Sequence, residues 1–206
     1  MSHLRSDIRQ RCLEIVALYP QPRSAMLPLL HLAQEQDGYL SDEGIADVAE
    51  LTGTTPADVR GTASFYDMFH LEPVGKYVVS VCTNVACLIA GGLEMLAHAG
   101  AALGCSVGGT SDDGLFTLEE AECLADCDIA PCVQVNHRYV RATTPADFDH
   151  LVDELRRGAL DHDVPAHGSL VRVRRSVGLR ATRAEVVDQR ALAREARAAR
   201  EAEKEQ

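Results

Sequence analysis

The sequence predicts an α/β protein in which an N-terminal helical bundle, residues 1–74, is followed by a mixed region of strands and helices, residues 75–160. Three observations lead to this prediction. Apolar residues recur at helical spacing through the first seventy residues, and from Lys76 the period becomes that of strands. Beyond about residue 160 the composition changes to Arg and Ala, so residues 161–206 are expected to form a helical or flexible basic tail.

Four helices are expected in the first region. The first has an apolar face and should be stopped by Pro20 and Pro22, because proline cannot continue a helix. A second is expected to begin at the N-cap Ser24 and to end at Gly38, and two shorter helices should begin at Ser41 and Thr55. The apolar face of the first helix consists of Ile8, Cys12, Ile15, Val16 and Tyr19.

In the second region, residues 75–160, stretches with the apolar spacing of strands alternate with stretches that have the apolar spacing of helices. A strand should deliver Cys82 at its end, a helix should follow, and a closing helix should begin at Thr144. The order strand, helix, strands, helix is typical of a thioredoxin-like α/β layer, whose loops after strands commonly hold the functional site. The expected strands are residues 77–81, 115–118, 133–136 and 139–141, and a tight turn at residues 136–138 joins the last two.

Composition excludes several classes of protein. The chain is 46% apolar, enough for a core, and has a formal net charge of −11. Residues 172–206 hold ten Lys or Arg and six Asp or Glu, but the interleaved acids and the lack of aromatic residues argue against nucleic-acid binding. No apolar run is long enough for a membrane span and no signal peptide is apparent, so we expect a cytoplasmic protein without direct membrane insertion.

Four of the seven cysteines form two closely spaced pairs. Cys82 and Cys87 are separated by four residues, Cys123 and Cys127 by three, and 35 residues lie between the pairs. Both sulfurs of a pair can reach one small metal centre, so four thiolates can converge on one site. Four thiolates, two for each iron, are the ordinary ligands of a binuclear iron-sulfur cluster, and the pattern favours an electron carrier.

Zinc, disulfides and buried apolar thiols are the competing interpretations. Zinc ribbons usually pair their ligands as Cys-x2-Cys, and neither gap here is two. Disulfides are disfavoured by the odd number of cysteines and by the reducing compartment expected for this chain. Iron-sulfur ligation is therefore the preferred interpretation of the two pairs.

The residues around the pairs suit a cluster. Small residues in the segment 88–92 allow close approach of the backbone and could direct N–H groups at sulfur. Asp126 and Asp128 lie beside the second pair. If these carboxylates face the cluster they lower its reduction potential; the alternative is that they are loop or helix-cap residues exposed to water.

The three other cysteines are not expected to bind metal. Cys12 lies on the apolar face of the first helix and should be a core residue. Cys105 lies in a Gly-rich stretch that predicts a surface turn. Cys132 opens a predicted strand, and packing is its expected role.

Four segments resemble a known family, and the resemblance covers roughly residues 5–160. The chain resembles the E-type iron-sulfur subunit of bacterial NADH-quinone oxidoreductase, respiratory complex I, within the thioredoxin-like 2Fe-2S ferredoxins. The segments are Ser-Phe-Tyr-Asp-Met-Phe at 64–69, Pro-Val-Gly-Lys-Tyr at 73–77, Val-Cys-Thr-Asn at 81–84, and Glu-Cys-Leu-x-x-Cys-Asp-x-Ala-Pro at 122–131.

This resemblance implies a helical domain followed by a thioredoxin-like domain with one 2Fe-2S cluster. The implied ligands are Cys82, Cys87, Cys123 and Cys127. FMN and NADH would be bound by a partner, the F-type flavoprotein of the complex, and the cluster would exchange single electrons with its FMN. The resemblance also implies contact with other peripheral-arm subunits of complex I, on the cytoplasmic side of the inner membrane. Cys132 and the tail after about residue 160 lie outside the family pattern.

The sequence and the resemblance leave other functions open. Related proteins serve NAD-linked hydrogenases and formate dehydrogenases, and a free 2Fe-2S ferredoxin or a zinc-stabilised interaction module would share some of the features. The chain has no Gly-x-Gly-x-x-Gly run and no P-loop, so we expect no nucleotide site of its own. Its eight histidines are scattered, and no catalytic residue is predicted.

Overall fold

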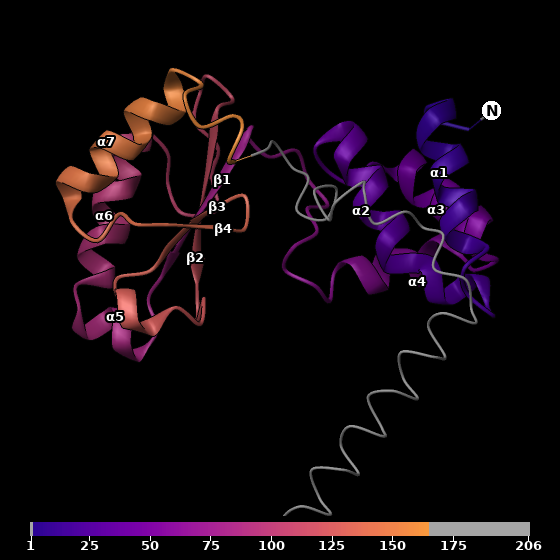
Figure 1. Ribbon diagram of the computed structural model, residues 1–206, viewed down its shortest axis with the longest axis horizontal. Helices are drawn as coiled ribbons and strands as arrows, with labels where there is room; N and C mark the ends of the chain where they lie inside the picture. Colours follow the sequence, from indigo (N-terminus) through magenta and orange to yellow (C-terminus); the bar gives the residue numbers. More distant parts are fainter. Residues whose placement is uncertain (1, 165–206) are drawn as a thin grey trace, which may run out of the picture. The chain divides into compact units, whose positions relative to one another are not determined.

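The computed structural model describes residues 2–164 (Figure 1). Within this range it contains seven α-helices, two short 3-10 helices and one four-stranded sheet, so the predicted α/β class is confirmed. The predicted tail, residues 161–206, lies outside the described residues except for its first four.

The first part of the chain is helical. Its apolar side chains form one core, and each of its four α-helices contributes to it. The helices are α1 (Ser6–Val16), α2 (Met26–Asp37), α3 (Asp42–Thr52) and α4 (Pro56–Ala63), and the side chains with no exposed surface include Cys12, Leu29, Leu30, Val48 and Val59. The core location predicted for Cys12 is confirmed.

The ends of these helices follow the predicted capping signals. Gly38 ends α2 in the left-handed region at φ 82°, where glycine has no steric penalty. Ser41 caps α3 by accepting a hydrogen bond from the Gly44 N–H at 3.1 Å. Thr55 and Asp58 form a reciprocal capping box at the start of α4.

Two predicted details of the helices are wrong. Ser24 is not the N-cap of α2, because residues Pro22–Ala25 form a separate 3-10 turn and α2 begins at Met26. Proline has the φ of a first helical residue, so the turn starts at Pro22 and already includes Ser24. Tyr19 is 39% exposed and lies beyond α1, which ends at Val16 because the residue before Pro20 is restricted away from helical angles.

The second part of the chain contains the sheet, in the order β2-β1-β3-β4. β1 pairs with β2 in parallel and with β3 antiparallel, and β3 pairs antiparallel with β4. A tight turn was predicted at residues 136–138; it has only two residues, Asn136 and His137, because Arg138 already begins the next strand. Both turn residues have positive φ, as the tightest hairpins require. The strands are β1 (Tyr77–Cys82), β2 (Phe116–Ala121), β3 (Val133–Val135) and β4 (Arg138–Val140).

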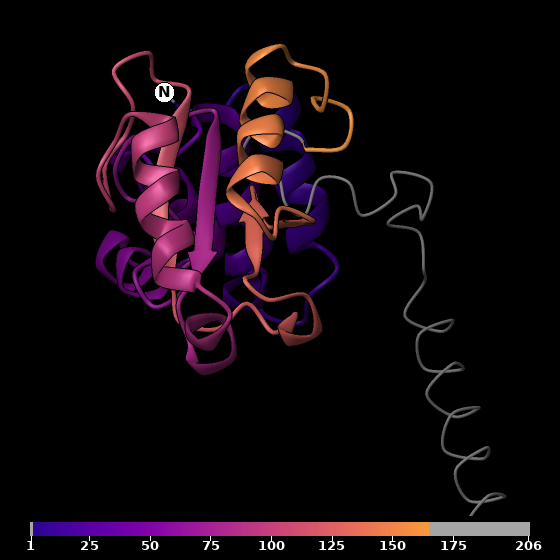
Figure 2. The same ribbon diagram turned by 90° about the vertical axis from the view of Figure 1, so that its left-hand side faces the viewer.

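Helices α6 (Gly92–Leu103) and α7 (Pro145–Arg156) lie side by side over one face of the sheet (Figure 2). A capping box of Thr144 and Asp147 starts α7, at the predicted position. The core between the sheet and these helices is built from large side chains without exposed surface, among them Tyr77, Val79, Phe116, Leu118 and Phe148. This core holds β1 and β2 in position at its centre.

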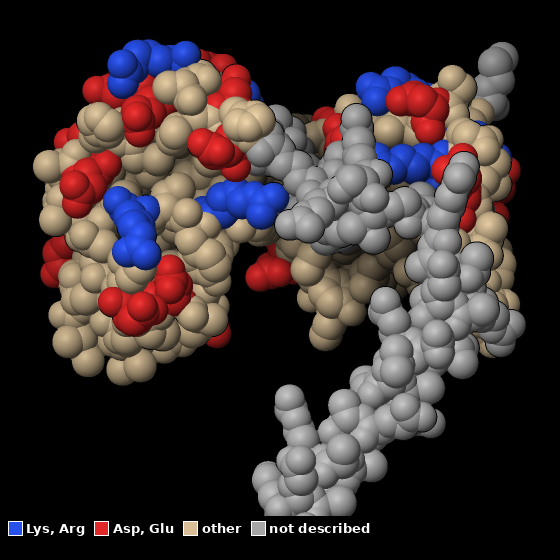
Figure 3. All heavy atoms as spheres, in the orientation of Figure 1, with Lys and Arg blue, Asp and Glu red and all other residues tan. Residues whose placement is uncertain are grey.

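Charged side chains are distributed over the surface without one dominant basic region. On the face shown in Figure 3, the Lys and Arg side chains of the described residues gather in separate groups with acidic side chains beside them. A continuous basic face, which nucleic acid would require, is not seen on this side of residues 2–164. In the same part of the chain, no helix has both the length and the apolar character needed to cross a membrane.

Gly75 allows the chain to enter β1 directly against β2. A Cβ atom at this position would lie 2.7 Å from the backbone carbon and 2.8 Å from the backbone nitrogen of Phe116. The Gly75 N–H also donates to Thr117 Oγ1 at 2.7 Å. Since the backbone of β2 is itself fixed by the sheet, there is no room for a side chain.

We therefore expect Gly75→Ala to lower the free energy of unfolding by about 2 kcal/mol or more, through the clash with β2. The measurement is the midpoint of urea unfolding followed by circular dichroism. The matched control is Gly61→Ala in α4, where a Cβ meets no atom within 4 Å, and which should stabilise the helix by about 0.5–1 kcal/mol. Equal midpoints for the two variants would contradict this account.

Candidate metal centre

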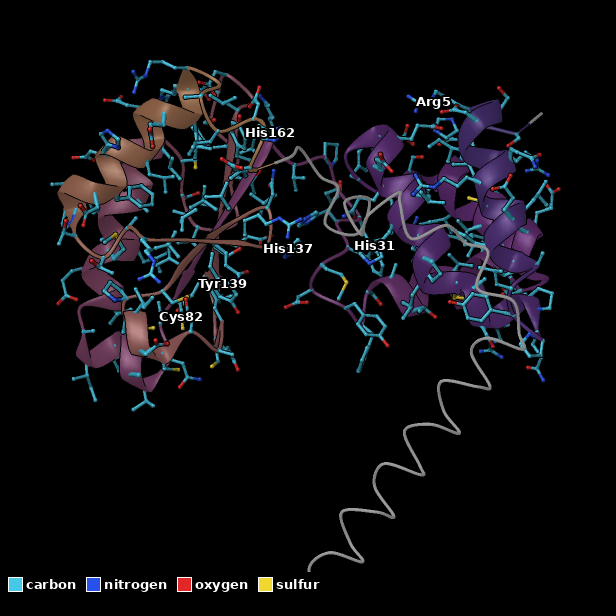
Figure 4. The ribbon with its side chains drawn as sticks, viewed as in Figure 1. Arg5, His31, Cys82, His137, Tyr139 and His162 are labelled. Carbon is cyan, nitrogen blue, oxygen red and sulfur yellow. The ribbon has the colours of Figure 1, made fainter. Side chains whose placement is uncertain are left out.

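The parallel pairing of β1 and β2 brings the first and third cysteines of the predicted site to one edge of the sheet. Cys82 is the last residue of β1 and is opposite Ala121, the last residue of β2, so Cys123 follows two residues after the same edge. The Thr83 N–H donates to the Ala121 carbonyl at 3.0 Å and continues the pairing one residue further. Figure 4 labels Cys82 at this end of the sheet.

Cys87 is returned toward Cys82 by a short helix, α5 (Val85–Ile89). Asn84 is its N-cap, and the Asn84 carbonyl accepts from the Leu88 N–H at 2.7 Å. Cys87 is the buried residue of this helix and is 1% exposed, compared with 2% for Cys82. The sequence did not predict α5, because five residues are too few for a periodic pattern.

Cys123 and Cys127 lie on the irregular segment between β2 and β3, and both are exposed. The only helical turn of the segment is the 3-10 helix η2 (Cys127–Ile129), and Ala125 has φ 61°, a left-handed conformation that is uncommon for alanine. Leu124 packs against the buried cysteines from this segment. The site therefore has a buried half, built by β1 and α5, and an exposed half on a loop.

The four thiols lie in two pairs that also act on each other. Within each pair, one thiol raises the pKa of the other: Cys82 raises that of Cys87, and Cys123 raises that of Cys127. Cys127 interacts electrostatically with both Cys82 and Cys87, so the two pairs face one site. Across residues 2–164, three or more His, Cys, Asp or Glu side chains do not gather as the ligands of a single ion would. Two sulfurs for each metal is the division that a binuclear cluster uses.

The pKa is raised for one thiol of each pair, Cys87 and Cys127. Burial, and then the adjacent Cys82 thiol, raise the pKa of Cys87, although an N–H donated to its sulfur acts in the opposite direction. The pKa of Cys127 is raised by desolvation, by its neighbours Cys123 and Cys82, and by the charge of Asp126. Binding of a metal that needs thiolates therefore has to release protons from this site.

Cys132 contributes to the site through its backbone. Its N–H donates to Cys87 Sγ at 3.4 Å, and its carbonyl accepts from the Cys82 N–H at 3.0 Å. The side chain is 3% exposed and packs with Cys82 and Cys87, and burial raises its pKa to about 12. The predicted packing role is confirmed, but the N–H donated to sulfur was not predicted, since no side-chain pattern in a sequence reports it.

Two other predictions are modified. Cys105 was expected in a surface turn, but it is half-buried and packs against the core of the sheet. It directly follows Gly104, which ends α6, and its N–H still bonds to the Gly100 carbonyl of that helix at 3.2 Å. The close approach predicted for residues 88–92 occurs at Gly92, where a Cβ would lie 2.7 Å from the Cys82 carbonyl oxygen and 2.8 Å from that of Cys87. Gly92 thus lets α6 start directly against the two buried cysteines.

The two aspartates of the second pair differ. Asp126 is half-buried, precedes η2 without making a side-chain cap, and its charge raises the pKa of Cys127 and of Cys132. Whether this carboxylate faces a bound cluster and lowers its potential stays a prediction. Asp128 is exposed.

These features are those of a small iron-sulfur protein with a thioredoxin-like sheet, and comparison with protein families agrees. The family model "Thioredoxin-like [2Fe-2S] ferredoxin" matches residues 12–156. The chain belongs to this family.

Particular relatives can be named. The chain is 44% identical to the E-type subunit of NADH-quinone oxidoreductase from Mycobacterium tuberculosis (strain ATCC 25618 / H37Rv) over 143 residues, which cover 69% of this chain and 57% of the relative. It is 40% identical over 148 residues to "NADH-quinone oxidoreductase subunit 2" of Thermus thermophilus, covering 70% of this chain and 82% of the relative. The chain thus matches little more than half the length of its mycobacterial relatives.

A solved structure has a similar fold. The NAD+-reducing [NiFe]-hydrogenase in its H2-reduced state matches with a TM-score of 0.55 and 24% sequence identity, over 63% of this chain and 22% of that chain. At this level of identity the similarity concerns the fold alone.

The family carries one [2Fe-2S] cluster, and the donor set of this chain suits it. Four sulfurs are available as two pairs, one N–H is already directed at a sulfur, and apolar residues such as Leu124 and Ala130 cover the buried half. Soft thiolate ligands and a partly desolvated pocket are what such a cluster requires.

The unequal exposure of the cysteines gives a direct test on the metal-free chain. We expect Cys123 and Cys127 to react with iodoacetamide at pH 8 at least tenfold faster than Cys12 and Cys132, whose buried thiols have pKa values of about 11 and about 12. Time-resolved labelling followed by peptide mass spectrometry would measure each rate, with the unfolded chain in urea as the control. Uniform rates in the folded chain would contradict the difference in exposure between these two groups of cysteines.

Proposed function

We propose that Cys82, Cys87, Cys123 and Cys127 bind one [2Fe-2S] cluster and that the chain transfers single electrons between this cluster and FMN in a partner flavoprotein. The parent complex is an NADH-quinone oxidoreductase, as the names of its relatives at 36–44% identity suggest. NADH and FMN belong to the partner, the F-type flavoprotein, and the chain supplies no catalytic residue. The observation that carries this proposal is the pairing of four thiols at one edge of the sheet.

The residues of this chain have defined roles in that function. When bound, the cluster supplies a centre that gains and loses one electron. Cys82 and Cys87 hold its inner half among apolar side chains, which exclude water, while the Cys132 N–H stabilises negative charge on the Cys87 sulfur. The charge of Asp126 disfavours reduction and lowers the potential.

The surface beside the site suits a protein partner. Figure 3 shows mostly uncharged atoms at the end of the molecule where Figure 1 places α5. Four large apolar side chains are exposed there on α5 and on the start of α6: Val85 is 66% exposed, Leu88 45%, Ile89 83% and Leu93 51%. An apolar patch of this kind, next to exposed ligands, lets a partner approach the cluster closely and exclude water. We call these four residues the α5 patch.

We further propose that the two parts of the chain have different functions. Residues 75–160 form the cluster domain, and residues 1–74 form a docking platform for neighbouring subunits, since a soluble carrier needs little beyond the cluster domain. Contact with other peripheral-arm subunits would place the chain on the cytoplasmic side of the inner membrane. Residues 165–206 lie outside the described part of the chain, and no role is assigned to them.

The alternative to this parent complex is an NAD-linked hydrogenase or formate dehydrogenase, in which the chain would be the equivalent 2Fe-2S subunit. Relatives above 30% identity favour the NADH-quinone oxidoreductase, whereas the hydrogenase likeness is one of fold alone. The proteins that copurify with the chain from its native cells distinguish these parent complexes.

The ligand assignment predicts the effect of one substitution. In anaerobically purified Cys123→Ser, we expect the visible absorption of the cluster to weaken or shift and the EPR signal of the dithionite-reduced protein to change, because serine replaces a soft ligand by a hard one. The wild-type chain should contain about two irons.

The control for this prediction is Cys105→Ser, which changes a thiol outside the site. Its spectra and iron content should equal those of the wild type. An unaltered, full-strength cluster in Cys123→Ser would overturn the assignment of that ligand. A colourless wild-type chain that binds one zinc after anaerobic reconstitution would overturn the proposed function.

The α5 patch predicts a variant defective in partner binding. Ile89→Asp should weaken binding to the flavoprotein at least tenfold, because a charge is placed in an apolar contact, and should leave the spectrum of the cluster unchanged. Calorimetric titration with the purified flavoprotein measures the affinity. Val107→Asp, at a residue that is 49% exposed outside the patch, is the matched control, and an equal loss in both variants would argue against the patch.

A further inference from the structure

The exposed half of the metal centre depends on a loop with little regular structure. Between β2 and β3, the segment that carries Cys123 and Cys127 has one three-residue 3-10 turn, and the Ile129 N–H bonds back to the Asp126 carbonyl at 3.1 Å. The buried half has the backbone of β1 and the helix α5 behind it. Two exposed thiols on such a loop need a further constraint if they are to keep a fixed distance from Cys82 and Cys87.

A tyrosine on the outermost strand of the sheet provides such a constraint. The Tyr139 hydroxyl donates a hydrogen bond to the carbonyl of Leu124, the residue that follows Cys123. In the sheet, Tyr139 is paired with Gln134 and Gln134 with Ser80, two residues before Cys82; both Tyr139 and Cys82 are labelled in Figure 4. The contact joins β4 to the middle of the loop, fifteen residues earlier in the sequence.

The position of Tyr139 in the sheet explains how its side chain reaches the loop. Tyr139 is opposite Gln134 on β3, whereas Val133 and Val135 on either side of Gln134 are buried in the core beneath α6 and α7. Because neighbouring strand residues point to opposite faces, Tyr139 is directed away from that core. It is 53% exposed, so it does not contribute a core side chain.

Leu124 connects this hydrogen bond to the sulfurs. Its side chain packs against the buried cluster of Cys82, Cys87 and Cys132, while its carbonyl is held by Tyr139. The next residue, Ala125, has the left-handed φ that turns the chain toward Cys127. The loop is therefore fastened at Leu124 on both sides, immediately before its turn.

We propose that Tyr139 is a positioning residue of the metal centre, whose hydroxyl fixes the Cys123–Cys127 loop and thereby the spacing of the exposed thiols from the buried pair. This inference rests on the proposed cluster function and adds a residue to it that binds no metal. A rigid aromatic side chain with two rotatable bonds is well suited to this role, since little conformational entropy is lost in holding it.

The test is Tyr139→Phe in the full-length chain, which retains the ring and removes the hydroxyl. We expect the reconstituted variant to lose iron to a chelator about fivefold faster than the wild type, the effect of one lost hydrogen bond. The EPR signal of the reduced variant should broaden, because the loop samples more positions. In the metal-free chain, amides of residues 124–127 should exchange with deuterium faster, while those of β1 remain unchanged.

Tyr19→Phe, at an exposed tyrosine of the helical part, is the matched control and should equal the wild type in all three measurements. Unchanged iron loss, EPR line shape and loop exchange in Tyr139→Phe would overturn the inference. Faster exchange in β1 as well as in the loop would also overturn it, since that would show a general loss of stability. A wild-type chain that binds no cluster would instead defeat the proposed function, and the exchange measurement on the metal-free chain would still decide the role of Tyr139.

Discussion

The parallel pairing of β1 with β2 is the constraint on which the candidate metal centre depends. Residues that are 40 positions apart, such as Cys82 and Glu122, become neighbours because the two strands run in the same direction and end at the same edge. The Cys82 thiol lies 3.4 Å from the Glu122 carbonyl oxygen as a result. In an antiparallel pair, the ends of the two strands would lie at opposite edges, and the cysteines that follow them would not meet. The helices α5 and α6 provide the long crossover that parallel strands require.

One half of the site is buried in apolar side chains, and the other half is open to a partner protein. Burial of Cys82 and Cys87 surrounds one side of the site with apolar atoms, and the exposure of Cys123 and Cys127 leaves the other side open. An electron can cross from a partner only over a short distance, so an electron carrier cannot bury its whole centre. In the proposed complex the partner would cover the α5 patch, whose most exposed member is Ile89, at 83%.

Local signals in the sequence were sufficient for much of the fold. The caps at Ser41, Thr55 and Thr144 act through residues three positions away, and each is found where it was predicted. Helix starts were predicted less reliably where a neighbouring turn competes for the same residues or where the helix is very short. Ser24 is a good capping residue, but Pro22 starts a turn before it, and α5 is too short to produce a period.

The chemistry of the candidate site could be predicted from the number, type and spacing of the thiols alone, and these favour an iron-sulfur cluster with cysteine ligands. Spacing is a local property, and two sulfurs four or five positions apart can always reach a common centre. Three features could not be predicted in this way: which pair is buried, the Cys132 N–H directed at a sulfur, and the hydrogen bond from Tyr139 to the Leu124 carbonyl. These relations arise from strand register and from the face on which each side chain falls, and both depend on residues far apart in the chain.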